Sequence, residues 1–69
     1  MKEFADRLKE LRTEKKLSQT QLAIDTNLSK SAIAYWEVSE RVPNAQAIVT
    51  LAKYFNVSCD YLLGVSDRR

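Results

Sequence analysis

Histidine is absent from this 69-residue sequence, and cysteine, proline and glycine each occur once, as Cys59, Pro43 and Gly64. A single cysteine cannot form an intrachain disulfide, and without histidine it cannot complete the usual ligand set of a zinc site. The lack of histidine also excludes histidine-dependent acid–base catalysis. We expect Cys59 to be a half-buried side chain rather than a reactive thiol, because free cysteine is commonly buried.

Long apolar runs are missing as well. No stretch approaches the roughly 18 residues that a membrane-spanning helix needs, and no signal peptide opens the chain, so we expect a cytoplasmic protein without a membrane partner. Eleven Lys and Arg residues stand against nine Asp and Glu residues, for a net charge of +2. This balance permits nucleic-acid binding but does not argue for it. No Gly-rich phosphate loop or acidic metal cluster is present, so we expect no enzyme, cofactor or small-molecule substrate.

Helix starts are marked by a repeated pattern, in which a capping residue lies between two apolar residues of a hydrophobic staple. The pattern occurs as Leu17-Ser18…Leu22, Leu28-Ser29…Ile33, Val57-Ser58…Leu62 and, with Asn as the cap, Pro43-Asn44…Ile48. Gln21 is predicted to complete a capping box with Ser18. Four such patterns in one short chain are strong evidence for a helical protein.

The remaining helix boundaries follow from periodicity and from stop signals. Phe4, Leu8 and Leu11 share one face of an opening helix, while Asn56 and Gly64 are suited to helix ends. The sequence therefore predicts an all-α domain of five short helices near residues 2–15, 19–25, 30–38, 45–55 and 59–63. Only the tail, residues 66–69, looks like a linker.

A helix-turn-helix is predicted over residues 18–38. The helix at 19–25 is barely two turns long and is separated from the next by a tight connection, so the two helices must cross steeply. Inward-facing side chains from both helices would close the core between them: Leu22, Ala23, Leu28, Ile33 and Trp36.

These residues resemble a known family, the phage repressor and Cro (Xre) type of helix-turn-helix. The resemblance is carried by Ser18-Gln19-x-x-Leu22-Ala23, Leu28-Ser29-x-Ser31-x-Ile33, Trp36-Glu37 and Pro43, and by Leu51-Ala52-Lys53-Tyr54-Phe55-Asn56-Val57-Ser58 and Asp60-Tyr61-Leu62-Leu63-Gly64. It covers about residues 4–64 and implies a lambda-repressor-like domain over residues 1–69 that binds double-stranded DNA. Asn27 replaces the usual turn glycine, and Ser39-Glu40 replaces a frequent Gly-Lys, which should weaken DNA binding.

The resemblance places the helix at 30–38 in the major groove. At 3.6 residues per turn, its outward face holds Lys30, Ser31, Ala34, Tyr35 and Val38. We predict base contacts from four of them: Lys30, Ser31, Ala34 and Tyr35. Lys30 suits guanine O6 or N7, Ser31 suits several base edges, and Ala34 and the Tyr35 ring suit a thymine methyl. The alternative is a solvated surface, or a Tyr35 hydroxyl that reaches a phosphate.

Phosphate contacts are predicted around the start of the helix at 19–25, where free backbone N–H groups favour an anion. The resemblance assigns this role to Gln19, with Ser18 beside it. Arg41 is the best phosphate-binding cation in the loop after the helix at 30–38, although a freely solvated Arg41 is nearly as good an interpretation. Asn44 is predicted mainly as a helix cap, with a phosphate contact as a secondary role.

Two further expectations concern the protein's own contacts. The resemblance implies a structural salt bridge between Arg12 and Glu37, behind the DNA-reading helix. The apolar residues at the end of the chain exceed what a five-residue helix needs for its own core. We therefore predict a two-fold interface that includes Leu62 and Val65, with Val65 the leading candidate.

The first functional hypothesis is a sequence-specific transcriptional regulator, a repressor that binds a palindromic operator as a homodimer. One domain of this kind buries only about 600–1,000 Å² on DNA, so two are usually joined. An antitoxin-type DNA-binding regulator with a protein partner would share the same fold and site. A helical protein–protein interaction module that has lost DNA binding is the third hypothesis, favoured by the weak charge and by Glu40.

Overall fold

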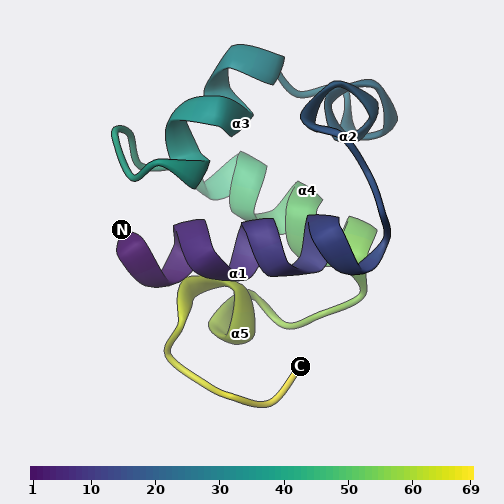
Figure 1. The fold of residues 1–69 in the computed structure, drawn as a ribbon. Coiled ribbons are helices and arrows are strands. Elements are labelled where there is room, and N and C mark those ends of the chain that lie inside the picture. Colours follow the sequence, from purple (N-terminus) through teal and green to yellow (C-terminus); the bar gives the residue numbers. More distant parts are fainter.

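The computed structural model describes residues 1–69 as five helices without strands (Figure 1). The helices are α1 (Lys2–Glu14), α2 (Gln19–Thr26), α3 (Lys30–Glu37), α4 (Ala45–Phe55) and α5 (Cys59–Leu63). Every observed helix end coincides with the predicted residue or lies next to it. None of the helices combines the length and hydrophobicity that spanning a bilayer requires.

Side-chain caps start four of the helices at the predicted residues. Ser18, Ser29, Asn44 and Ser58 accept hydrogen bonds from the backbone N–H groups of Gln21, Ala32, Ala47 and Tyr61, at 2.8 to 3.2 Å. The predicted capping box is wrong in its second half, because the Gln21 amide donates to Asp25 at 2.7 Å instead of reaching back to Ser18. The charged carboxylate one turn ahead is a strong acceptor for the amide N–H, and this bond turns the side chain away from the Ser18 N–H that it would accept in a capping box.

All five helices end in the same motif. Each helix is closed by a residue with a left-handed backbone. This residue directly follows the helix at Asn27 (φ 58°), Asn56 (56°) and Gly64 (83°), and lies one position further on at Lys16 (57°) and Ser39 (62°). At each end the N–H groups of this residue and of the next one donate to carbonyls three and five residues earlier, which is the Schellman motif. Asn27, Asn56 and Gly64 agree with the sequence-based expectation, whereas the left-handed Lys16 and Ser39 were not predicted.

The connections α1–α2, α2–α3 and α4–α5 are only three or four residues long. Leu17, Leu28 and Val57 each follow a left-handed residue and precede a serine cap, and each packs against the core. One apolar side chain therefore closes one helix and staples the next. The α3–α4 connection differs, because it is longer and Glu40 occupies the equivalent place as an exposed, charged residue.

The core is built around α1, which lies between α5 on one side and α2 and α3 on the other (Figure 1). Twelve buried residues from all five helices form one cluster. Within it, the rings of Phe4 and Trp36 meet edge to face, with centroids 6.1 Å apart. Trp36 is only 7% exposed, which agrees with the prediction that it is a core residue and not a base-stacking platform.

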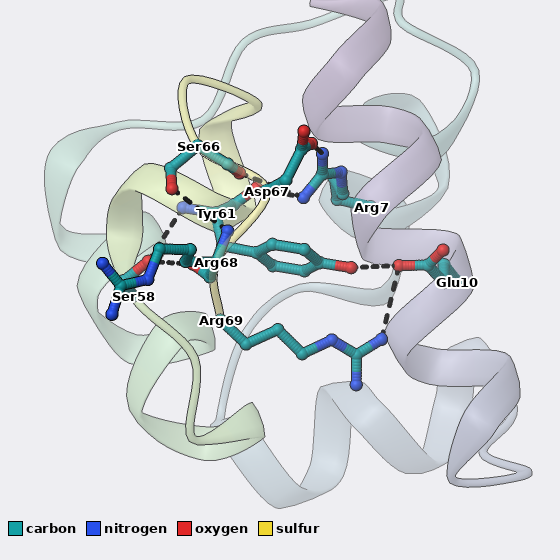
Figure 2. A network of polar contacts seen from close by, with 8 residues as sticks. All are labelled: Arg7, Glu10, Ser58, Tyr61, Ser66, Asp67, Arg68 and Arg69. Atoms are coloured by element: carbon teal, nitrogen blue, oxygen red, sulfur yellow. Dashed lines mark hydrogen bonds and ion pairs between the residues drawn. The ribbon is translucent and has the colours of Figure 1, made fainter.

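The tail, residues 66–69, is folded against α1 and α5 and is not the predicted linker (Figure 2). Arg7 of α1 forms an ion pair with Asp67 at 2.8 Å. Arg69 donates to both carboxylate oxygens of Glu14, which lowers the pKa of that carboxyl. Exposed pairs of this kind contribute little to stability, so their main effect is to set the path of the tail.

Gly64→Ala should destabilise the fold. The left-handed backbone penalises any L side chain, and a Cβ at this position would overlap the Cβ of Glu3 in the first turn of α1. We expect the free energy of unfolding, measured by urea denaturation, to fall by about 2 kcal/mol or more.

Ser39→Gly is the matched control, for which we expect the free energy of unfolding to change in the opposite direction. Ser39 is exposed and left-handed, so the loss of its Cβ relieves strain without opening the core. We expect unchanged stability or a gain of up to about 1 kcal/mol. A loss of stability in Ser39→Gly comparable to that in Gly64→Ala would contradict the role assigned to backbone conformation.

Candidate nucleic-acid interface

The outward face of α3 is the one predicted from the sequence. Ile33 and Trp36 are buried in the core and set the rotation of the helix. The four residues predicted to contact bases are consequently exposed or half-buried: Lys30, Ser31, Ala34 and Tyr35. Tyr35 is 38% exposed although it is a large side chain. The structure thus gathers the predicted reading residues on one accessible face.

The polar groups of this face have no partner within the protein. The hydroxyls of Tyr54 and Tyr61 donate to Asp25 and Glu10, whereas that of Tyr35 donates to no protein group. The Lys30 ammonium and the Ser31 hydroxyl also form no hydrogen bond or ion pair inside the chain. Base edges in a major groove offer the donors and acceptors that such groups could bind.

The predicted ion pair between Arg12 and Glu37 is present behind α3. The guanidinium donates to both carboxylate oxygens at 2.7 and 2.9 Å, and the side chains are 16% and 3% exposed. The hydrogen bond with Glu37 raises the pKa of Arg12. Arg12 also donates to the Leu17 carbonyl at 2.7 Å, and Gln19 donates to Glu37 at 3.2 Å. The buried carboxylate therefore joins α1, α2 and α3.

Three of the four residues predicted to contact phosphates lie at helix starts and have hydrogen bonds in the fold. Ser18 and Asn44 cap α2 and α4 through their side-chain oxygens, and Gln19 donates one amide hydrogen to Glu37. Each of the three side chains keeps at least one further donor hydrogen. Phosphate binding is therefore compatible with these structural roles.

Arg41 has a contact that was not predicted. Its guanidinium carbon lies over the Tyr35 ring, 4.4 Å from the ring centre. A cation at this distance from an aromatic face is held by the ring's quadrupole. Arg41 follows Tyr35 by six positions, with a turn between them, so no helical periodicity could indicate the contact.

Another contact that was missed ties α2 to α4. The Tyr54 hydroxyl donates to Asp25 at 2.7 Å, and Gln21 donates to the other carboxylate oxygen. These bonds, Tyr54 first, lower the pKa of Asp25, and the same bond raises the pKa of Tyr54. The Gln21–Asp25 spacing of four residues was a readable signal, but the partner in α4 lies 29 residues away.

Positive charge is sparse in the helix-turn-helix itself. Between Lys16 and Lys53 the chain carries two cations and three acids: Lys30, Arg41, Asp25, Glu37 and Glu40. One of the acids, Glu37, is neutralised by Arg12. Few phosphates can therefore be neutralised from this segment, and recognition has to rely mainly on contacts other than charge.

One predicted interface residue is wrong. Leu62 is fully buried in the core of the domain, so it offers no surface to a second copy. It belongs to a five-residue helix, too short for the sequence to show which side faces α1. Val65 is 72% exposed, and its place in a two-fold interface stays a prediction.

A helix-turn-helix family model matches residues 8–62, most of the chain. The chain belongs to the Cro/C1-type (Xre) helix-turn-helix family of DNA-binding transcriptional regulators. The all-α fold and the family resemblance expected from the sequence are thereby confirmed.

Particular relatives share this domain. The chain is 41% identical over 61 residues to the HTH-type transcriptional activator BcrR of Enterococcus faecalis, covering 88% of this chain and 30% of that protein. It is 41% identical over 59 residues to the HTH-type transcriptional regulator AnsR of Bacillus subtilis, covering 86% of this chain and 51% of that protein. The chain thus spans between about a third and about half of these relatives' lengths.

A solved structure is also similar. The restriction-modification controller protein C.AhdI of Aeromonas hydrophila matches with a TM-score of 0.80 at 34% identity. The match covers 88% of this chain and 92% of that chain.

Arg12→Ala and Glu37→Ala should each destabilise the domain, because each strands the other charge in a poorly solvated place. We expect losses of about 3 kcal/mol for the single changes and a smaller loss for the double variant than their sum. A double-mutant cycle by urea denaturation measures the coupling. Simple additivity would show that the two side chains do not interact in solution.

Proposed function

We propose that this domain belongs to a sequence-specific transcriptional regulator that binds a palindromic operator as a homodimer and acts as a repressor. The observation that carries the proposal is the outward face of α3, where Lys30, Ser31 and Tyr35 present polar groups without protein partners. The family to which the chain belongs supports it.

On this proposal α3 lies in the major groove, with its N-terminal residues nearest the base edges. Lys30 donates to guanine O6 or N7, and Ser31 donates to or accepts from a neighbouring base. Ala34 and the Tyr35 ring, one turn further along, pack against thymine methyl groups. The Arg12–Glu37 pair holds the opposite side of α3 in place, so these contacts need little reordering on binding.

Phosphate anchoring is assigned to the residues around α3, namely Ser18, Gln19, Arg41 and Asn44. The backbone N–H groups in the first turns of α2 and α4 support it, since a helix N-terminus attracts anions. Lys30 and Arg41 are the only cations between Lys16 and Lys53. Even if Lys30 neutralised a phosphate in addition to its base contact, these two cations would give a log–log salt slope no steeper than about −1.8 per domain, which is shallow for a DNA-binding protein.

A second copy would supply the affinity that one domain lacks, because two half-sites are bound together. Val65 is the exposed apolar residue that we assign to the two-fold interface. Repression requires only that the bound dimer occupy a promoter. Activation is the second candidate, favoured by the name of the relative BcrR. In vitro transcription from a promoter that carries the selected operator separates the two.

The reading role of α3 is tested by replacing Lys30, Ser31 and Tyr35 with alanine together. Each lost base contact should cost about 1–3 kcal/mol on the selected operator and much less on a scrambled duplex. Binding to both duplexes is measured across a salt series, with the operator first selected from genomic fragments.

The matched control is Lys9→Ala with Thr13→Ala, which removes a cation and a hydroxyl from the exposed face of α1. This variant should bind like the wild type. If the triple change lowers affinity for the operator and the scrambled duplex by equal factors, α3 is not the reading helix.

Assembly is tested with Val65→Ser, which should lower the dimer fraction in sedimentation and weaken operator binding. Ile24→Ser is the control, since Ile24 is a similarly exposed β-branched residue, 68% against 72%, that we place outside the interface. The wild type should protect two half-sites about 34 Å apart in a footprint. Protection of one unrepeated half-site by a monomer would contradict the dimer.

A further inference from the structure

Arg41 and Tyr35 form a stacked pair at the C-terminal end of α3. The guanidinium carbon is 4.4 Å from the ring centre, and neither side chain makes a hydrogen bond or ion pair with any other protein group. Three arginines elsewhere each pair with a carboxylate: Arg7, Arg12 and Arg69. All the polar atoms of the stacked pair are therefore available to a ligand.

The end of α3 explains why Arg41 lies there. The N–H of Ser39 donates to the Trp36 carbonyl at 3.1 Å, and the N–H of Glu40 donates to the Tyr35 carbonyl at 2.9 Å. The left-handed backbone of Ser39 allows both hydrogen bonds to form and reverses the direction of the chain, so that it runs back along α3. Arg41 is consequently returned to the outward face of α3, beside a residue of the reading face.

We propose that Arg41 and Tyr35 act as one reading unit, which recognises a pyrimidine carrying a 5-methyl group next to a guanine. This inference rests on the proposed function and refines it. Arg41 acts partly as a positioning residue that fixes the Tyr35 ring, and partly as a reader itself. A purely anchoring Arg41 would instead strengthen binding to every duplex alike.

The chemistry of the pair selects this base step. A guanidinium over an aromatic face engages the ring through its own face, which leaves its in-plane N–H donors free. Those donors match guanine O6 and N7, while the carbon edge of the tyrosine ring is apolar and matches the C5-methyl group in the major groove. The separation of 4.4 Å exceeds the rise of about 3.4 Å between stacked bases by roughly one ångström, which is less than one base step, so the two groups can address two neighbouring bases.

The experiment uses the duplex that the wild type selects from a random-sequence pool. Tyr35→Leu identifies the position that Tyr35 reads, as the one where base preference relaxes. There, thymine is replaced by uracil, which lacks the methyl group, and by cytosine with and without its 5-methyl group. The neighbouring guanine is replaced by 7-deazaguanine, which lacks N7. We expect the wild type to lose about fourfold in affinity without the methyl group and about tenfold without N7.

Arg41→Lys is the decisive variant, because it keeps the charge but loses the planar fork. We expect it to retain the wild-type salt slope and to lose both preferences. Tyr35→Phe keeps the ring and should keep the methyl preference. The Lys9→Ala, Thr13→Ala variant is again the control: it removes a cation from the exposed face of α1 and should leave both preferences and the salt slope intact. Thermal unfolding, which should be unchanged because both side chains lie on the surface, confirms that the variants are folded.

The outcomes separate this inference from the proposed function. A wild type that selects no sequence from the pool overturns both. A wild type that selects a sequence but ignores the methyl group and N7 overturns only the reading unit, as does an Arg41→Lys variant that keeps both preferences. If the methyl groups of thymine and of 5-methylcytosine raise the affinity equally, the reading unit recognises the methyl group itself. If only the methyl group of thymine raises the affinity, the reading unit recognises thymine.

Discussion

The buried carboxylate of Glu37 determines where α3 can lie. It has to be neutralised, because a lone charge in this position would be costly, and Arg12 does this with two nearly parallel hydrogen bonds. A planar fork on a planar carboxylate restrains rotation as well as distance. Since taking two charges out of water offsets much of their attraction, the pair contributes orientation more than net stability. The ion pair on the inner side of α3 therefore fixes which residues of α3 face outward.

Much of the fold follows from signals that lie close together in the sequence. A serine cap with an apolar residue on each side gives a helix start, and Asn or Gly gives a helix end, as at Asn56 and Gly64. These are local interactions, so they can be recognised without knowledge of the packing. Lys16 and Ser39 show the limit of the method: both are left-handed, although neither residue type favours that conformation. Only one of the five Schellman motifs contains a glycine. The C-terminal ends of the other helices therefore depend on tertiary packing to hold their left-handed residues in place.

The site divides in the same way. Periodicity is sufficient to place Lys30 and Ser31 outward, because the buried positions of α3 recur at helical spacing. The pairing of Arg12 with Glu37 could be expected only from the family resemblance. The contacts of Arg41 with Tyr35 and of Tyr54 with Asp25 carry no sequence signal, since each depends on how a chain reversal or a second helix brings distant side chains together. Leu62 was misplaced because five residues are too few to define an amphipathic face.

The connections in which one apolar residue serves two helices also constrain how this chain can change. Leu17, Leu28 and Val57 each provide the apolar contact both for the end of one helix and for the start of the next. An inserted residue next to any of them would allow only one of the two contacts to form, so both helix ends would be destabilised. Substitution is therefore the only easy route of divergence at those three joints. The α3–α4 connection carries no such double requirement, so it can lengthen or shorten while the core stays intact. Variation in length is thus directed to the one loop that carries Arg41, and a lineage could change its DNA contacts there without rebuilding the domain.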